Sequence, residues 1–218
     1  VTNPDSPIKV EDVTRADLIL VPNGHGDEVG QTVPIAQQTG ARVITGGFEL
    51  GSWFVEQGIP AAQVMRGNPG ARFRVDGITI RVVNSVHGSG LPAPTPTVPY
   101  GGPAAGFVIT FENGYTVYFA GSTAATQDQA LWAQMYRPDA AILVLPASGE
   151  PMDFAMQVRL LMTDNPNLAT IIPHHHRVVQ QPGQTTIVEA QAAVTAMGLP
   201  YVISVPAIGQ PFTFTKDA

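Results

Sequence analysis

The sequence predicts an α/β fold, and three of its features indicate this class. Short apolar runs typical of buried strands alternate with segments typical of helices along most of the chain. Two further segments carry the alternating pattern and the turn dipeptides of β-hairpins. The chain has 218 residues, of which 44% are hydrophobic, and this is enough to bury the core of one domain. We therefore expect a single domain over residues 1–218.

The first half of the chain is expected to open with strands and helices and to continue with the two hairpins. Residues 16–21 (ADLILV) are too apolar for a half-buried strand and too few for a helix, so they predict a buried strand. The other elements expected here are a helix at 29–38 closed by Gly40, a strand at 41–45, a helix at 49–57, and hairpins at 72–84 and 107–120 with Asp76-Gly77 and Asn113-Gly114 at their turns.

The second half is expected to alternate helices with strands. Helices are predicted at 127–136, 152–162 and 186–197, buried strands at 140–145 and 169–173, and one or two strands at 201–214. The segment at 88–106 is rich in proline and glycine and lies between the two hairpins. Two interpretations of it stay open, because such a segment is either an ordered connector with polyproline character or a loop that covers a site.

The composition argues against two classes of partner. The formal net charge is −6 and the few Lys and Arg residues form no cluster, so binding to nucleic acid or to an anionic membrane surface is not expected. No apolar run of the sequence approaches the ~20 residues of a membrane-spanning helix. The chain has no cysteine, which excludes disulfides, thiolate metal ligands and a cysteine nucleophile. The compartment stays open between the cytoplasm and the periplasm or the outside of the cell.

All histidines of the chain lie where predicted strands end. They are His25, His87, His174, His175 and His176. Carboxylates adjoin the first of them in the run NGHGDE at residues 23–28, whose glycines allow a tight turn. Imidazoles and carboxylates that converge from several loops suit a Zn, Mn or Fe site, or a proton-transfer site. A single histidine is more often an ordinary surface or core residue, but that interpretation explains the whole set less well.

Five segments of the chain carry motifs in a recognisable order. They are ADLILVPNGHGDEVGQ, ARVITGGFELGSWF, VNSVHGSG, YFAGST and IIPHHH. Together they resemble the motifs of the metallo-β-lactamase superfamily, and most of all its branch of small metal-dependent hydrolases that includes ascorbate-6-phosphate lactonase-like proteins. The resemblance covers nearly the whole chain. It implies a four-layer αββα sandwich, the metallo-β-lactamase fold, with the site at one edge of the two sheets.

The resemblance also implies a set of metal ligands, from which the chain departs at several positions. The implied ligands are His25, Asp27, Glu28, His87 and His175. Asn23 stands where the family has its first His, Glu28 where it has another His, and Ser122 where it has the Asp that bridges two metals. Without that bridging anion two neighbouring cations repel each other, so one divalent metal is expected. Zinc is the first candidate, and Mn or Fe(II) also suit two carboxylates and one imidazole.

By the same resemblance the chain is expected to be a metal-dependent hydrolase of an ester, lactone or amide-like bond in a small molecule. A bound metal polarises the carbonyl and lowers the pKa of its water toward ~7. Asp27 is expected to orient that water, and His25 and His175 are expected to be catalytic as ligands or proton shuttles. The residues expected to contact the ligands from behind are Asn23, Ser122, His174 and His176.

Two other classes of function stay open. One is a family member that has lost its metal and binds a small molecule or a partner chain. The other is a lyase or transferase that uses the histidines as acid and base. Among lesser candidates, Glu150 and Asp153 either reach the site or begin a helix, and Arg177 either holds an anionic substrate or is solvated.

Members of the family begin with strands that this chain lacks, since it starts at Val1 near the point where those strands would end. An apolar sheet edge without a neighbour promotes aggregation. We therefore expect a cleaved and retained N-terminal fragment, or a partner chain, to complete the sheet. A truncated chain is the alternative, and a homo-oligomer stays open.

Overall fold

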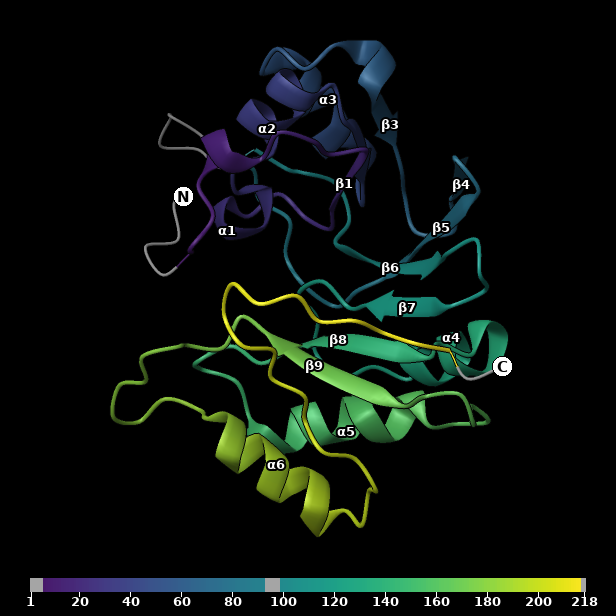
Figure 1. The fold of residues 1–218 in the computed structure, drawn as a ribbon, viewed down its shortest axis with the longest axis vertical. Coiled ribbons are helices and arrows are strands. Elements are labelled where there is room, and N and C mark those ends of the chain that lie inside the picture. The colour runs from purple at the N-terminus through teal and green to yellow at the C-terminus, as the bar shows by residue number, and fades with distance from the viewer. Residues whose placement is uncertain (1–5, 93–98, 217–218) are drawn as a thin grey trace.

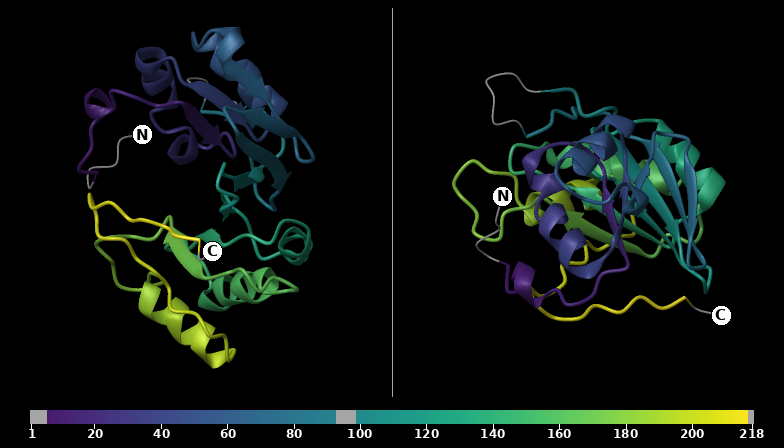
Figure 2. Two further views of the ribbon diagram at one scale, coloured as in Figure 1. Left: turned by 45° about the vertical axis from the view of Figure 1, so that its right-hand side comes forward. Right: turned by 90° about the horizontal axis from the view of Figure 1, so that it is seen from above.

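The computed structural model describes residues 6–92 and 99–216, and it contains two β-sheets with helices on their outer faces (Figure 1, Figure 2). One sheet has three strands and the other has six. The sheets face each other across a shared core, so the arrangement is helix, sheet, sheet, helix. The predicted four-layer α/β sandwich is therefore confirmed. No helix of the described residues is long and apolar enough to cross a membrane.

The smaller sheet is parallel throughout and comes from the first third of the chain. Its strands are β1 (Leu18–Val21), β2 (Arg42–Thr45) and β3 (Val64–Arg66), in that spatial order. The helices of this part are α1 (Gly26–Val29), α2 (Thr32–Thr39) and α3 (Phe48–Glu56), with short 3-10 turns η1 (Val10–Asp12) and η2 (Ala61–Gln63). Strands β1 and β2 and helix α3 lie where the sequence predicts them.

Two features of this part differ from the sequence prediction. The single helix expected at 29–38 is divided into α1 and α2, because Gly30 takes a φ of 48° at the end of α1. Gly40 closes α2 as expected, with a left-handed φ of 74°. Strand β3 was not predicted, since three residues are too few to carry a periodic pattern.

The larger sheet is mixed, with antiparallel strands first and parallel strands last. Its strands are β4 (Arg72–Val75), β5 (Ile78–Asn84), β6 (Ala105–Thr110), β7 (Thr116–Phe119), β8 (Ala140–Val144) and β9 (Thr170–His174), in that spatial order. Its helices are α4 (Asp128–Tyr136), α5 (Pro151–Leu161) and α6 (Ile187–Ala196). Both predicted hairpins and all three predicted helices are confirmed.

The turns of the hairpins form as their dipeptides predict. Between β4 and β5, Asp76 has a φ of 49° and Gly77 a φ of 87°, and two successive positive φ angles are the signature of a type I′ turn. In the second hairpin Gly114 has a φ of 79°. The glycine in each turn therefore provides a conformation that most other residues adopt only with strain.

The C-terminal segment differs from its prediction. Strands were expected at 201–214, but the described chain forms only an isolated bridge between Ile203 and Ile171. Pro206 and Pro211 lack the N–H that a strand donates, and Gly209 has a φ of 73°. The segment therefore adds no strand to the sheet, and Phe214 near its end packs with Tyr115 and with Val117 and Ala140 of the larger sheet.

The connector at 88–106 is described in part. Gly90 pairs with Tyr100 in an antiparallel bridge, and the Leu91 amide donates to the Pro99 carbonyl at 2.9 Å. The middle of the connector, residues 93–98, lies outside the described residues. The chain therefore returns on itself, so that residues 90–91 lie beside residues 99–100.

Three hydrophobic clusters lie between the layers. One packs the first helices on the smaller sheet and includes Leu50 and Phe54. A second contains residues of both sheets, among them Ile44, Ile80 and Phe107. The third packs α4, α5 and α6 on the larger sheet. These clusters explain the layered arrangement, because helices pack on the outer face of each sheet and residues of the two sheets pack against each other.

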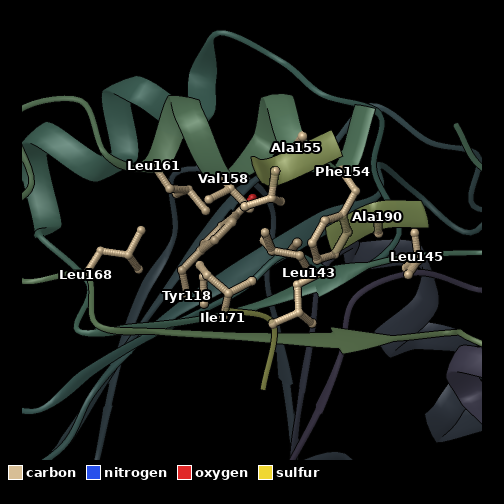
Figure 3. Close-up of a cluster of buried hydrophobic side chains, with 14 of the residues drawn as sticks. Tyr118, Leu143, Leu145, Phe154, Ala155, Val158, Leu161, Leu168, Ile171 and Ala190 are labelled. Atoms are coloured by element: carbon tan, nitrogen blue, oxygen red, sulfur yellow. The ribbon is translucent and has the colours of Figure 1, made fainter. Parts of the chain in front are cut away.

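Figure 3 shows the third cluster, in which side chains of α5 meet those of the sheet. Phe154, Val158 and Leu161 project from α5 toward Leu143 and Ile171, and all of these side chains are at most 1% exposed. Residues at i, i+4 and i+7 of a helix share one face. The packing of this face fixes the rotation of α5 about its axis, and this rotation decides which other α5 residues reach the site.

Candidate metal and catalytic site

The loops that carry the predicted site residues meet at one edge of the fold. Strands β5, β7, β8 and β9 run in the same direction, because β6 is antiparallel to both β5 and β7 while β8 and β9 are parallel to β7. Their carboxyl ends therefore lie at the same edge of the larger sheet. A cavity of about 470 Å³ opens there, lined among others by His25, Asp27, His87, Ser122 and His175.

The loop after β1 is held in place by backbone contacts. The His25 amide donates to Asn23 Oδ1 at 3.0 Å, and the Gly24 amide donates to Ser89 Oγ at 3.1 Å. A Cβ at Gly24 would lie 3.0 Å from the carbonyl oxygen of Gly90, so this position suits glycine. The His25 carbonyl accepts from the Val29 amide at 2.8 Å. This bond starts α1 and places two carboxylates in its first turn.

Two imidazoles from different loops form a pair. His87 Nε2 lies 3.2 Å from His25 Nδ1, and the two rings are nearly perpendicular with their centroids 4.9 Å apart. Burial lowers the pKa of His87, and the neighbouring imidazoles of His25 and His175 lower it further, with partial compensation from Asp27. His87 is therefore held toward its neutral form, in which one ring nitrogen has a free lone pair.

A third imidazole faces the two carboxylates of α1. His175 Nε2 lies 3.4 Å from Asp27 Oδ2 and 3.6 Å from Glu28 Oε1. The Glu28 carboxylate also accepts a hydrogen bond of 2.7 Å from Ser122 Oγ. The Asp27 side chain is 62% exposed and the Glu28 side chain only 7%. Two carboxylates directed at one imidazole nitrogen form a site with negative charge that attracts a cation.

The other histidines of the late run lie beside His175. His174 Nδ1 is 2.6 Å from His175 Nδ1, and the His174 ring packs on Phe119 with centroids 5.0 Å apart. Burial lowers the pKa of His174 to about 3, with a further contribution from His175, so this ring is neutral. His175 has a φ of 63°, a left-handed conformation that is uncommon outside glycine. Burial also lowers the pKa of the partly buried His176.

The pairwise distances between these donors suit ligands of a metal. Two ligands of a tetrahedral zinc ion lie about 3.3 Å apart when each bond is 2.0–2.1 Å long. The separations of 3.2, 3.4 and 3.6 Å among the nitrogen and oxygen atoms match this value. Within the described residues, however, no three such side chains already surround a common point as a metal site. The donor set therefore fits a metal in its chemistry and spacing, and side-chain rotations would complete the coordination.

Most of the predicted site residues lie together in the structure, and Asn23 lies apart from them. It brings His25, Asp27, Glu28, His87 and His175 together, with Ser122 and His174 in contact with two of them. Asn23 is fully buried, and its Nδ2 has no hydrogen-bond partner among the described residues. Asn23 therefore holds the loop backbone by accepting the His25 amide, and among the described residues its side chain forms no hydrogen bond to the other donors.

Three polar side chains of α5 and the turn before it also line the cavity. They are Glu150, Asp153 and Gln157. The sequence left Glu150 and Asp153 open between the site and a helix start, and the structure shows both at the cavity. Glu150 precedes α5 without a side-chain capping bond. The sequence analysis did not identify Gln157 as a site residue. The only feature of the sequence that could have indicated it is a polar residue near the apolar face of a predicted helix.

Comparison with known proteins also indicates a metal-dependent hydrolase family. Residues 2–203 match the family model described as the beta-lactamase superfamily domain. A UPF0173 metal-dependent hydrolase of Rubrobacter xylanophilus is 35% identical over 176 residues, covering 80% of this chain and 69% of that protein. Another of Myxococcus xanthus is 34% identical over 180 residues, covering 80% of this chain and 61% of that protein. The chain thus spans roughly two thirds of the length of these relatives.

Solved structures share the fold. Igni18, a metallo hydrolase from Ignicoccus hospitalis, has a TM-score of 0.79 at 22% identity, covering 99% of this chain and 88% of its own. An isothiocyanate hydrolase from Delia radicum gut bacteria has a TM-score of 0.69 at 22% identity, covering 96% of this chain and 80% of its own. At such low identity these structures support the fold alone.

Proposed function

Because the chain belongs to the beta-lactamase superfamily and to its UPF0173 metal-dependent hydrolases, we propose that it hydrolyses an ester, lactone or amide-like bond of a small molecule with one divalent metal. One observation carries the proposal. Two carboxylates of α1 and one imidazole from the end of β9 meet at the cavity, with His175 Nε2 3.4 Å from Asp27 and 3.6 Å from Glu28. A divalent cation bound there would offset the charge of the two carboxylates and accept the imidazole lone pair.

The ion would be held by Asp27, Glu28 and His175, with His25 and His87 completing or facing its coordination. When bound, it supplies a Lewis acid that polarises a carbonyl and acidifies water. Zinc suits these ligands, and so do Mn and Fe(II). Glu28 is oriented by the hydroxyl of Ser122 at 2.7 Å, while the more exposed Asp27 has the freedom to orient water.

The imidazole pair would handle protons. His87 Nε2 and His25 Nδ1 are 3.2 Å apart, so whichever of these nitrogens carries a hydrogen can donate it to the other. The neutral form of His87, favoured by burial and by the adjacent imidazoles that lower its pKa, keeps a lone pair that can accept a hydrogen bond from bound water. This pair lines the same cavity as Asp27 and His175, within reach of a leaving group bound there.

A single ion is favoured over two by the residues that surround the site. The Oδ1 atom of Asn23 accepts the His25 amide, and the Ser122 hydroxyl donates to Glu28. Neither residue contributes an anionic oxygen that could lie between two cations. Two divalent ions would therefore repel each other without a bridging carboxylate.

Metal titration tests the proposal. The chelated protein is dialysed against Zn²⁺ or Mn²⁺, its metal content is measured, and hydrolysis of aryl esters, lactones and anilides is followed. We expect about one equivalent of metal and hydrolysis that disappears on chelation. Close to two tightly bound equivalents would overturn the single-ion site. Hydrolysis that is unchanged by chelation, or no metal binding at all, would favour an acid-base enzyme or a binding protein.

A further inference from the structure

Gln157 is a polar side chain of the cavity that the metal chemistry does not use. It lies in the middle of α5 on the face that packs toward the sheet, and it is only 2% exposed. It nevertheless lines the cavity together with Asp27, His87 and His175. A buried amide at a cavity wall must have its N–H and C=O groups paired, or one end is left for a ligand.

A chain of hydrogen bonds fixes which end of Gln157 faces the cavity. It starts at the Thr126 backbone N–H, which can only donate, and which donates to Gln129 Oε1 at 3.2 Å. The other end of the Gln129 amide, Nε2, then donates to Gln157 Oε1 at 3.0 Å. Because a backbone donor sets the first bond, the orientation of both amides follows without ambiguity. The free end of Gln157 is therefore its NH₂ group.

This NH₂ group has no protein partner in the part of the chain that the structure describes. Within residues 6–92 and 99–216, the only hydrogen bond of the Gln157 side chain is the one that its oxygen accepts from Gln129. The Gln157 nitrogen is also absent from the buried atoms that lack a partner, so it retains contact with the open cavity. Gln129, which is fully buried, holds the amide from behind. The arrangement presents a fixed donor to whatever occupies the cavity.

The charges of the cavity narrow the class of occupant. Its described lining includes the carboxylates Asp27, Glu150 and Asp153 and contains no Lys or Arg. Arg177, the residue that the sequence left open as an anion-binding group, is exposed and does not belong to the lining. An anionic group would meet three carboxylates here, with only a metal ion to offset them.

We infer that Gln157 is a substrate-binding residue, whose Nε2 donates to an uncharged oxygen acceptor of a neutral or cationic ester or amide. The inference rests on the proposed hydrolase function and adds the class of substrate to it. A site that provides a fixed donor discriminates against substrates that leave this donor unpaired, by about 10-fold to 100-fold for a neutral group.

Kinetics with matched probes test this assignment. The metal-loaded protein is assayed with 4-nitrophenyl acetate, which is neutral, and with mono-4-nitrophenyl succinate, which is anionic. We expect kcat/KM to be at least about 10-fold higher for the neutral ester. Gln157→Glu keeps the oxygen that Gln129 contacts and replaces the donor by an acceptor, so kcat/KM for the neutral ester should fall about 10-fold or more. Gln157→Met removes the donor without adding a charge and should also lower it.

Gln37→Glu is the matched control. It makes the same chemical change on α2, where Gln37 is exposed and its side chain donates to the Gly58 carbonyl. It should leave kcat/KM unchanged. Equal kcat/KM values for the wild type and both Gln157 variants, with a folded protein and normal metal content, would overturn the inference while leaving the hydrolase function intact.

A binding measurement separates the two proposals. In protein labelled with [15N]glutamine, the NH₂ signals of Gln157 are identified by their loss in Gln157→Met, and N-methylacetamide and succinate are titrated in turn. We expect the signals to shift with the neutral amide and not with the dianion. Such a shift without hydrolysis of any ester would support Gln157 as a binding residue and refute the hydrolase function. No shift up to saturation of the cavity would refute the role of Gln157.

Discussion

Neighbouring residues of the site have different surroundings, and these differences predict their roles. Asp27 and Glu28 are adjacent in α1, yet the side chain of Asp27 is 62% exposed and that of Glu28 is 7% exposed. Glu28 is fixed by Ser122 on one side and faces His175 on the other. Asp27 has no such support from behind. Glu28 is therefore suited to hold a ligand position, and Asp27 to adjust to water or substrate.

Asp27→Ala should abolish activity without unfolding the protein. The variant removes a carboxylate 3.4 Å from His175 Nε2, so metal affinity and kcat/KM should each fall by at least about 100-fold. Because Asp27 is exposed, the free energy of unfolding of the metal-free protein should change by less than about 0.5 kcal/mol. Metal content, turnover and urea denaturation measure the three quantities. Asp17→Ala, which removes an exposed partner of Arg15, is the control, and unchanged metal content in Asp27→Ala would contradict the ligand assignment.

His174 should make the protein sensitive to acid. Its pKa in the folded state is lowered to about 3, mainly by burial, whereas an unfolded histidine titrates near 6.5. Between these values the unfolded state binds a proton that the folded state excludes, so stability falls as the pH falls below 6.5. Because of this residue alone, the free energy of unfolding should fall by about 2 kcal/mol from pH 7 to pH 5.

The comparison of wild type with His174→Phe isolates this contribution. Phenylalanine retains the packing on Phe119 but does not titrate. We expect the variant to lose about 2 kcal/mol less than the wild type between pH 7 and pH 5, in urea denaturation of the metal-free proteins. Equal losses in the two proteins would show that His174 titrates normally in the folded state.

At the scale of the elements, local signals explain why most helices begin and end where they do. Helix α6 begins with a capping box, in which Thr186 Oγ1 accepts from the Glu189 amide at 3.1 Å and Glu189 Oε2 accepts from the Thr186 amide at 2.8 Å. The first hairpin is set by Asp76 and Gly77. Such signals act within a few residues, so they operate in the same way before and after the chain has folded.

Thr186→Ala should weaken α6 by removing this cap. We expect the free energy of unfolding to fall by about 1 kcal/mol, measured by urea denaturation. Thr195→Ala is a suitable control, because Thr195 Oγ1 contacts Gln191 of the same helix, donating to its carbonyl and accepting from its Nε2, and caps no helix end. An equal loss in both variants would show that the cap contributes nothing specific to α6.

At the scale of the whole molecule, the two sheets share one core. Phe107 of β6 is fully buried in the cluster that contains residues of both sheets, including Ile44 of β2. This cluster includes Leu18 and Leu20 of β1, the strand that leads into the loop with His25, and so fixes that loop relative to the loops of the larger sheet. The site is therefore assembled only when both sheets are packed together.

Phe107→Ala should destabilise both sheets at once. Truncation of a buried phenylalanine costs about 3–5 kcal/mol, and we expect a single transition at lower urea concentration. In a Trp132→Phe background, circular dichroism and the fluorescence of Trp53, which lies against the cluster of the smaller sheet, should report the same midpoint. Separate midpoints would show that the sheets unfold independently.

The sequence predicted most of the fold, and it predicted which residue types would gather at the site. Buried strands, hairpin turns and helix ends are local patterns, so the prediction for these elements needed no knowledge of the rest of the chain. It missed β3, which is too short for a pattern, and it assigned strands to 201–214, where prolines prevent a ladder. The position of every histidine at the end of a predicted strand, together with the family resemblance, explains the prediction of the histidines and carboxylates as one group.

Only the tertiary structure decided which of these groups meet and how they are oriented. His25 pairs with His87 across 62 positions of sequence, and Ser122 reaches Glu28 across 94. Such contacts depend on the packing of the two sheets, which no local pattern encodes. The same is true of Gln157, because its position follows from the rotation of α5 on the sheet and the direction of its amide from a bond that begins at Thr126. Short-range preferences determined the elements, whereas long-range packing determined the geometry of the site.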